Sequence, residues 1–226
     1  RGKVIASLPS LGLLTVAALT PPRHSIEYIE IDALPDLRTL PAFDLVAISA
    51  LTARIHAAYK IADHYKASGT RVAMGGLHVS VLPDEALQHC DAVIVGGAER
   101  AWPTLLDDLE KGQLRRVYSG ASESVFSDPV MPRFDLLKGR DYNRVTIQTS
   151  RGCPRACEFC GASPLVTTRF NQKPVGRVLS EIREARKWVR HSFFEFADDN
   201  TFLDKDWSRE LLRALAGEGI HYFTET

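Results

Sequence analysis

Three of the chain's four cysteines lie within eight residues, at Cys153, Cys157 and Cys160. Thiolates are soft ligands that favour iron–sulfur clusters, zinc or copper(I). A four-iron cluster is usually held by four cysteines, whereas only three stand close together in this sequence. If these three bind three of the irons, the fourth iron keeps an open coordination position. Because an open position on a metal is where chemistry takes place, the spacing predicts a reactive 4Fe-4S cluster.

Two other metal assignments use the same residues. A distant histidine or Cys90 would complete a zinc site, and Cys90 as a fourth ligand would close an electron-transfer cluster. A disulfide framework suits this chain poorly, because it has 226 residues, only four cysteines and enough apolar residues for a core. The alternatives correspond to two other functions: a non-catalytic iron–sulfur electron-transfer protein, and a small-molecule-binding sensor with a zinc-stabilised appendage.

Strands and helices that would carry the cysteine loop are expected on both sides of it. Residues 145–149 read as a strand, and the loop emerges at the carboxyl end, where β/α barrels place their active sites. A helix is expected after Pro174, with Val178 and Ile182 on its buried face. A second strand (193–197), a helix around 207–215 and a third strand (221–226) follow.

Asp198, Asp199 and Asn200 come directly after the second of these strands. An anionic side chain suits a ligand ammonium group. Asp and Asn also cap helices and form turns, so a purely structural interpretation stands beside the ligand-binding one.

At the cysteines the chain resembles the radical S-adenosylmethionine (SAM) superfamily. The resemblance rests on the Cys-x3-Cys-x2-Cys spacing, the preceding Ser150-Arg151-Gly152, Pro154, and Phe159 before the last cysteine. It implies that Cys153, Cys157 and Cys160 bind the cluster, which reductively cleaves SAM to a 5′-deoxyadenosyl radical. It further implies that Phe159 packs beside the adenine and that residues 198–200 approach the SAM amino group. The implied partners are a small-molecule or other substrate and an electron donor such as flavodoxin or ferredoxin.

The first half of the chain alternates strands with helices. This order predicts an α/β, Rossmann-like, doubly wound parallel five-stranded sheet over residues 1–118, with strands at 4–8, 26–31, 45–49, 71–74 and 92–95. Ligands of such sheets bind beyond the carboxyl ends of the strands. Small or polar residues follow three of the ends, although the glycines also suit turns. These candidate ligand contacts are Ser49, Thr52, Gly75, Gly76, His78, Gly96, Gly97 and Glu99.

Residues 3–118 are similar to the cobalamin-binding domain that precedes the barrel in many radical SAM enzymes. The similarity lies in Leu11-Gly12-Leu13-Leu14, residues 44–49, 75–78 and 96–99, and Trp102-Pro103. It implies that the nucleotide tail of cobalamin lies near the strand ends, with methyl transfer or radical rearrangement as the chemistry. Because the chain lacks the motif Asp-x-His-x-x-Gly, we expect no histidine of this domain to coordinate cobalt.

A polar, turn-rich linker is expected over residues 119–141. Residues 142–226 then correspond to the first three strands of a partial radical SAM barrel. A parallel sheet buried on both faces does not end at an open strand, so we expect the chain to be an amino-terminal fragment of a longer protein.

Composition narrows the function classes. The formal net charge is zero, which argues against the basic stripe of a nucleic-acid-binding surface. The sequence has no run of 18 apolar residues, so no membrane-spanning helix is expected. Thiols that hold an oxygen-sensitive cluster imply a cytoplasmic location.

Overall fold

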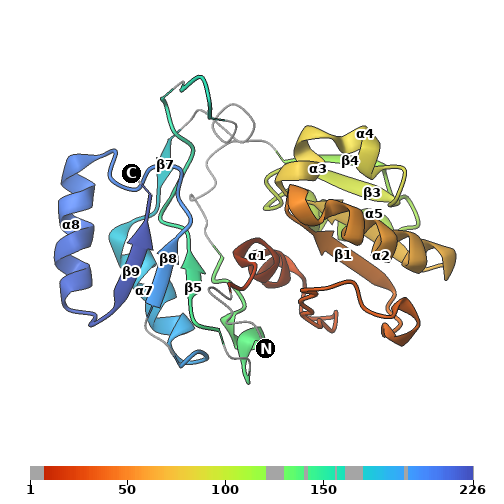
Figure 1. Cartoon of the computed structure of the whole chain (residues 1–226), viewed down its shortest axis with the longest axis horizontal. Coiled ribbons are helices and arrows are strands. Elements are labelled where there is room, and N and C mark those ends of the chain that lie inside the picture. The colour runs from red at the N-terminus through yellow and green to blue at the C-terminus, as the bar shows by residue number, and fades with distance from the viewer. Residues whose placement is uncertain are drawn as a thin grey trace. The chain divides into compact units, whose positions relative to one another are not determined.

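The computed structural model describes residues 8–120, 130–139, 142–155, 157–160, 170–190 and 193–225 (Figure 1). Two compact units make up the chain. We call one the cysteine unit; it contains the described residues of 1–18 and 124–226. The other, the four-strand unit, contains the described residues of 19–123. Of the predicted linker, only residues 119, 120 and 130–139 are described.

A parallel sheet with the strand order β1-β2-β3-β4 forms the centre of the four-strand unit. Its strands are β1 (Leu45–Ser49), β2 (Arg71–Gly75), β3 (Ala92–Gly96) and β4 (Val117–Gly120). The helices are α2 (Ile55–Ala67), α3 (Leu77–Val81), α4 (Pro83–Ala86) and α5 (Ala101–Glu110), with short 3-10 turns η1 (Leu37–Thr39) and η2 (Thr52–Arg54).

Helices cover both faces of this sheet. Met74 pairs with Val93 in the register of β2 and β3, and both side chains lie in the apolar core that α2 completes. Side chains alternate between the faces along a strand, so Tyr118, which is paired with Ile94, points to the opposite face. The Tyr118 hydroxyl donates to Asp108 of α5 at 3.0 Å. Packing of α2 and α5 on opposite faces agrees with the predicted doubly wound arrangement.

The predicted strand count of this sheet needs correction. Three predicted strands are confirmed, but residues 26–31 form no strand, and the side chains of Ile29 and Ile31 remain exposed. Their alternating pattern was misleading because alternation describes only the side chains, whereas a strand also requires its backbone to pair in a ladder with a neighbouring strand. The predicted strand 4–8 lies outside the described residues except for Leu8, which is not in a strand. The sequence analysis missed β4, a short edge strand that it placed across the domain boundary.

Three parallel strands in the order β5-β8-β9 form the main sheet of the cysteine unit. They are β5 (Val145–Ile147), β8 (Phe193–Phe196) and β9 (His221–Thr224), and they alternate with α7 (Val175–Ala185) and α8 (Lys205–Ala216). Each strand and helix predicted for residues 145–226 is therefore confirmed to within a few residues, whereas closure into a barrel stays a prediction. The remaining elements are α1 (Leu11–Leu19), η3 (Phe134–Leu137), β6 (Ser150–Arg151) and β7 (Asn171–Gln172).

The helices of this unit form where the sequence indicates. Helix α7 begins directly after Pro174 and buries Val178 and Ile182 completely. Helix α8 begins at the cap Asp204, whose carboxylate accepts hydrogen bonds from the backbone of Asp206 and Trp207, both at 3.0 Å. Helix α1, which the sequence analysis placed in the first domain, clusters with this unit up to residue 18, and Leu14 of α1 accepts a hydrogen bond from the Arg133 amide.

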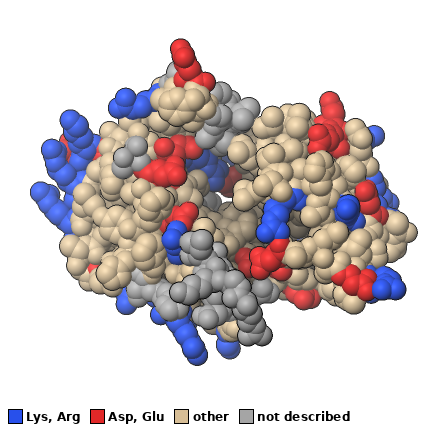
Figure 2. Space-filling model, viewed as in Figure 1, with Lys and Arg blue, Asp and Glu red and all other residues tan. Residues whose placement is uncertain are grey.

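The surface carries charges of both signs. Figure 2 shows basic and acidic side chains scattered over the visible face, in keeping with the net charge of zero. Within the described part of the chain, no helix is both long enough and apolar enough to cross a membrane.

Candidate functional site

The cysteine loop begins at the carboxyl end of β5. Cys153 is buried, Cys160 is half-buried and Cys157 is exposed, and none of them is in a disulfide. The Cys160 amide donates to the Cys157 carbonyl at 3.0 Å, which closes a turn between the last two cysteines. The donor chemistry fits an iron–sulfur cluster, since three reduced thiols share one loop. Among the described residues, however, no three His, Cys, Asp or Glu side chains are gathered closely enough to hold a metal ion.

Asp198, at the end of β8, binds the start of this loop. Its Oδ1 accepts hydrogen bonds from the backbone amides of Thr149 and Ser150 at 2.7 and 2.8 Å. Its Oδ2 accepts from the hydroxyl of Thr149 and, at 2.8 Å, from that of Thr201. The Asp198 side chain is buried, which raises the pKa of its carboxyl, while the hydrogen bonds from Ser150, Thr149 and Thr201 act in the opposite direction.

Asp199 binds the loop one step further along the chain. Its Oδ2 accepts the amide of Gly152 at 3.0 Å, and Gly152 has a φ of 80°, in the left-handed region that favours glycine. Asn200 is half-buried, and its side chain makes no hydrogen bond to any described residue. Of the three residues predicted to approach SAM, Asp198 therefore has a structural role, Asp199 is partly engaged, and Asn200 has an uncommitted amide.

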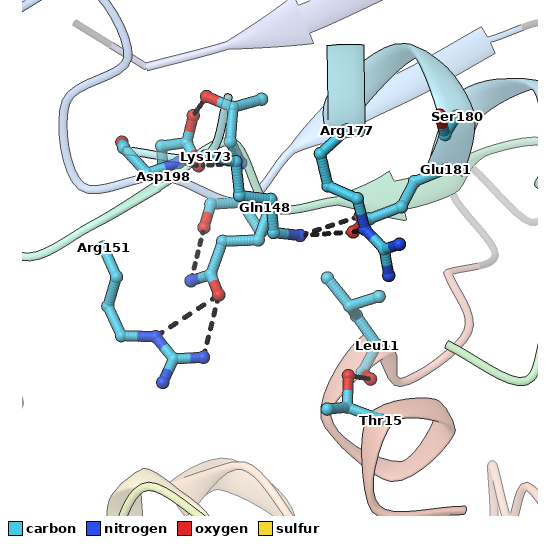
Figure 3. Close-up of polar contacts among 12 residues, drawn as sticks. Leu11, Thr15, Gln148, Arg151, Lys173, Arg177, Ser180, Glu181 and Asp198 are labelled. Atoms are coloured by element: carbon cyan, nitrogen blue, oxygen red, sulfur yellow. Dashed lines mark hydrogen bonds and ion pairs between the residues drawn. The ribbon is translucent and has the colours of Figure 1, made fainter. Parts of the chain in front are cut away.

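A buried ion pair supports Thr149 from the other side. The Lys173 amide donates to the Thr149 carbonyl at 2.8 Å, and the Lys173 ammonium donates to both oxygens of Glu181, at 2.9 and 2.7 Å (Figure 3). Glu181 has no exposed surface and also accepts from Arg177 at 3.2 Å. Burial lowers the pKa of Lys173, and the charge of Glu181 opposes this effect. Sequence reasoning missed this pair, since only the fold brings β7 beside the cysteine loop.

Two further side chains extend from the same loop base. Arg151 donates through Nε and Nη2 to Gln148 Oε1, at 3.3 and 2.9 Å (Figure 3). Phe159 is 93% exposed. The whole ring is therefore accessible, and an aromatic ring offers a large apolar face for stacking. The position of Phe159 is therefore compatible with its predicted place beside a bound adenine.

Cys90, the candidate fourth ligand, has a different environment. It lies in the apolar core of the four-strand unit at 3% exposure, and its Sγ donates to the Ala86 carbonyl at 3.1 Å. Burial raises the pKa of this thiol to about 11. Metal ligation requires the thiolate, so this environment argues against Cys90 as a ligand.

The strand ends of the four-strand unit are packed backbone against backbone. Gly76 has a φ of 99°, and a methyl group on it would lie 2.9 Å from Ser49 Oγ. A methyl group on Gly120 of β4 would lie 1.6 Å from the Gly97 carbonyl. The Gly96 amide donates to Ser80 Oγ at 2.9 Å. Gly96 and Gly120 therefore allow the end of β3 to lie against β4, and whether the glycines at 96 and 97 also contact a ligand stays a prediction.

His78 and Thr52, both predicted contacts of a ligand, lie together in this unit. The His78 Nδ1 is 3.2 Å from Thr52 Oγ1, and its Nε2 is 3.4 Å from Glu85 Oε1. The Tyr59 hydroxyl donates to the same Glu85 oxygen at 2.9 Å, and burial, more than this hydrogen bond, raises the pKa of Tyr59 to about 12. Both ring nitrogens of His78 are thus engaged within this unit, and the absence of a cobalt-coordinating histidine stays a prediction.

The remaining predicted contacts surround an exposed apolar surface. Ser49 and Gly96 are exposed, and Gly75, Gly97 and Glu99 are half-buried. Beside them, Leu51 is 77% exposed and Leu77 is 47% exposed. Apolar side chains at the ligand-binding edge of an α/β sheet are a common feature of cofactor sites. The sequence analysis noted the polar residues of this edge but not its leucines.

Comparison with known proteins identifies the first part of the chain. Residues 2–106 match the family model described as the B12 binding domain. The chain is 30% identical over 226 aligned positions to bacteriochlorophyllide d C-12(1)-methyltransferase from Chlorobaculum tepidum, covering 96% of this chain and 49% of the relative. The chain thus contains a B12-binding domain, has methyltransferases among its homologues and spans about half the length of this curated relative.

Two solved structures share the fold. One is a cobalamin-dependent S-adenosylmethionine radical enzyme, OxsB, with aqua-cobalamin and S-adenosylmethionine bound; its TM-score is 0.62 at 14% identity, over 83% of this chain and 30% of the other. The other is the radical S-adenosylmethionine methyltransferase TsrM from Kitasatospora setae, with cobalamin and a 4Fe-4S cluster bound. Its TM-score is 0.60 at 15% identity, over 81% of this chain and 42% of the other.

Proposed function

We propose that this chain supplies the cobalamin-binding and cluster-binding parts of a radical SAM methyltransferase. The observation that carries the proposal is the cysteine loop at the carboxyl end of β5, in a chain whose first part matches the B12 binding domain. The methyltransferase relative aligns with 96% of the chain, so the similarity extends well beyond that domain.

Different residues of the cysteine unit would bind the cluster and SAM. Cys153, Cys157 and Cys160 would hold a 4Fe-4S cluster, which when bound supplies the electron for SAM cleavage. Phe159 would cover the adenine, since its ring is exposed and available for stacking. The uncommitted amide of Asn200 would bind the polar end of SAM.

In the four-strand unit, the ends of β1, β2 and β3 would hold cobalamin. Gly76 and Gly96 are exposed, so a ligand can reach the backbone there, and Leu51 and Leu77 offer apolar contact. His78 is held by Thr52 and Glu85, so it would shape the Gly76 turn rather than coordinate cobalt. Methyl transfer is favoured over rearrangement because the curated relative is a methyltransferase.

The two alternative functions make different demands on the metal. A closed electron-transfer cluster needs a fourth protein ligand, and the buried Cys90 thiol with its raised pKa is unsuited to that role. A zinc-stabilised sensor would use the same three cysteines without iron or sulfide. Analysis of metal and sulfide therefore separates the zinc sensor from the two cluster proteins, and the Cys90→Ala variant together with SAM cleavage distinguishes those two.

The test is anaerobic reconstitution of the full-length gene product with iron, sulfide and hydroxocobalamin. We expect about four irons and four sulfides per chain, the number of a 4Fe-4S cluster. We also expect a bound-cobalamin visible spectrum, and 5′-deoxyadenosine or S-adenosylhomocysteine formed from SAM on reduction. Zinc without sulfide, or a cluster that persists in Cys153→Ala but is lost in Cys90→Ala, would refute the proposal.

A further inference from the structure

We propose that Asp198 and Asp199 are positioning residues that fix the backbone of the cysteine loop, rather than direct contacts of SAM. The two carboxylates bind three backbone amides within the four residues that precede Cys153. We call these three hydrogen bonds the clamp. The inference rests on the proposed function for the identity of the cluster, but the clamp is present in the protein without metal.

The acceptor capacity of Asp198 excludes a further ligand. A carboxylate offers about four lone-pair sites, and four donors already occupy them: the amides of Thr149 and Ser150 and the hydroxyls of Thr149 and Thr201. The side chain is also only 6% exposed. A ligand ammonium would have to displace one of these donors and then reach a site that is closed to solvent.

The clamp acts on the segment that sets the direction of the loop. Thr149 is held through its amide and hydroxyl by Asp198 and through its carbonyl by the Lys173 amide. Two positions further on, Gly152 takes a left-handed φ of 80° and donates to Asp199. Because the backbone is fixed at Thr149 and at Gly152, Cys153 is held in one orientation. Without these bonds, binding of the cluster would have to order the loop and would lose free energy to its conformational entropy.

Substitution by Asn separates a clamp from a charge contact. In Asp198→Asn, the amide oxygen still accepts from both backbone amides, and the amide nitrogen donates to the two threonine hydroxyls, which accept as well as donate. Asp198→Ala removes every bond. A clamp therefore tolerates Asn but not Ala, while a site that binds an ammonium by charge loses affinity in both variants.

The first readout is the rate of amide hydrogen exchange in the metal-free chain, which is measured by NMR. We expect Asp198→Ala to lower the protection of the Thr149 and Ser150 amides by about tenfold or more, because bonds to a charged acceptor are lost. Asp199→Ala should expose the Gly152 amide alone. Thr201→Val is the matched control, since it removes one bond to Asp198 and leaves the loop amides paired; their protection should stay within about threefold of wild type.

The second readout is iron bound after anaerobic reconstitution, measured alongside SAM affinity. We expect iron affinity to fall by about 10- to 100-fold in Asp198→Ala, as for other residues that orient metal ligands, and to be kept in Asp198→Asn and Thr201→Val. Two results would contradict the clamp. The first is Asp198→Ala protein with unchanged amide protection and unchanged iron affinity but weakened SAM binding. The second is an equal loss of amide protection in Asp198→Asn and Asp198→Ala.

The clamp stays testable if a variant does not fold or if the wild-type chain binds no iron. If Asp198→Ala fails to fold by circular dichroism, Asp198→Asn and Asp199→Ala carry the test, and an unprotected Gly152 amide in Asp199→Ala supports the clamp while an unchanged one opposes it. If the wild-type chain takes up no iron, the proposed function fails, yet the exchange measurement still decides whether the clamp exists.

Discussion

The strand ends of the two units are held by different groups, side chains in one unit and glycine backbone in the other. In the cysteine unit, the end of β5 is held by side chains: Asp198 accepts three hydrogen bonds from Thr149 and Ser150, and a buried ion pair lies behind Thr149. In the four-strand unit, the ends of β1 and β3 approach their neighbours through glycine backbone, with Gly76 near Ser49 and Gly97 near Gly120. Carboxylates suit a loop whose direction must be fixed, and glycines suit an edge that a large ligand approaches closely.

The largest expected effect separates the two cofactors. Replacing Cys153, Cys157 and Cys160 together with Ala should abolish iron and sulfide binding, since it removes every proposed ligand. Cobalamin binding should persist, because its proposed site lies in the four-strand unit. Metal analysis and the visible spectrum of the reconstituted protein measure both, with Cys90→Ala as the control that keeps the cluster. Loss of cobalamin binding in the triple variant would show that the two cofactors do not bind independently in the two units.

The four cysteines should also differ in reactivity before any metal is added. With a pKa of about 11, Cys90 has roughly one thousandth of its thiol ionised at pH 8, whereas Cys157 is exposed. Disulfide-reagent labelling of native, metal-free protein should therefore modify the exposed Cys157 on the order of a hundredfold faster than Cys90. Burial raises this pKa, so Cys90 labelling should rise about tenfold per pH unit up to about pH 11. Rapid labelling of Cys90 at pH 7 in folded protein would contradict its place in the core.

Gly120→Ala should disrupt the four-strand unit. The added methyl group would lie 1.6 Å from the Gly97 carbonyl, so the end of β4 must move away from β3. We expect a loss of about 3 kcal/mol in the free energy of unfolding of this unit, in the range of severe steric strain. Urea denaturation measures the loss, and Gly75→Ala is the control in the same sheet, because its added methyl group would lie at an ordinary 3.7 Å from Ile94 Cβ. Equal stability of Gly120→Ala and wild type would show that the strand end has room for side chains.

The smallest effect is expected at the cap of α8. Asp204→Ala removes two hydrogen bonds to backbone amides at the start of the helix and should destabilise the cysteine unit by about 1 kcal/mol. Asp204→Asn should recover most of this loss, since Asn is an equally good cap. Thermal unfolding of the three proteins checks the order. Because Asp204 does not contact the cysteine loop in the described structure, iron binding should be unchanged, unlike in Asp198→Ala.

How far the sequence predicted the molecule depends on how local each signal is. Helices α7 and α8 were predictable because Pro174 and the apolar spacing act within a few residues, whereas the cap Asp204 was not used. The strand expected at 26–31 was wrong because alternation says nothing about whether a partner strand is present. Edge strand β4 was missed because its four residues end in glycine at a change of composition.

The candidate site was predicted in its positions but only partly in its roles. The spacing of Cys153, Cys157 and Cys160 is a local pattern, and it identified the loop. The role of Asp198 could not be read from the chain, since its partners Thr149 and Ser150 lie 49 and 48 residues away. The pair of Lys173 and Glu181 was missed for a related reason, because nothing in the sequence shows that both are buried.

The central claim is a cluster on three cysteines with one iron open to SAM. Electron paramagnetic resonance of the reduced, reconstituted full-length protein, recorded with and without SAM, tests it most directly. We predict a 4Fe-4S signal whose g-values change when SAM is added, and no such signal after replacement of the three cysteines. A signal that SAM leaves unchanged, with four protein ligands assigned to the cluster, would contradict the account.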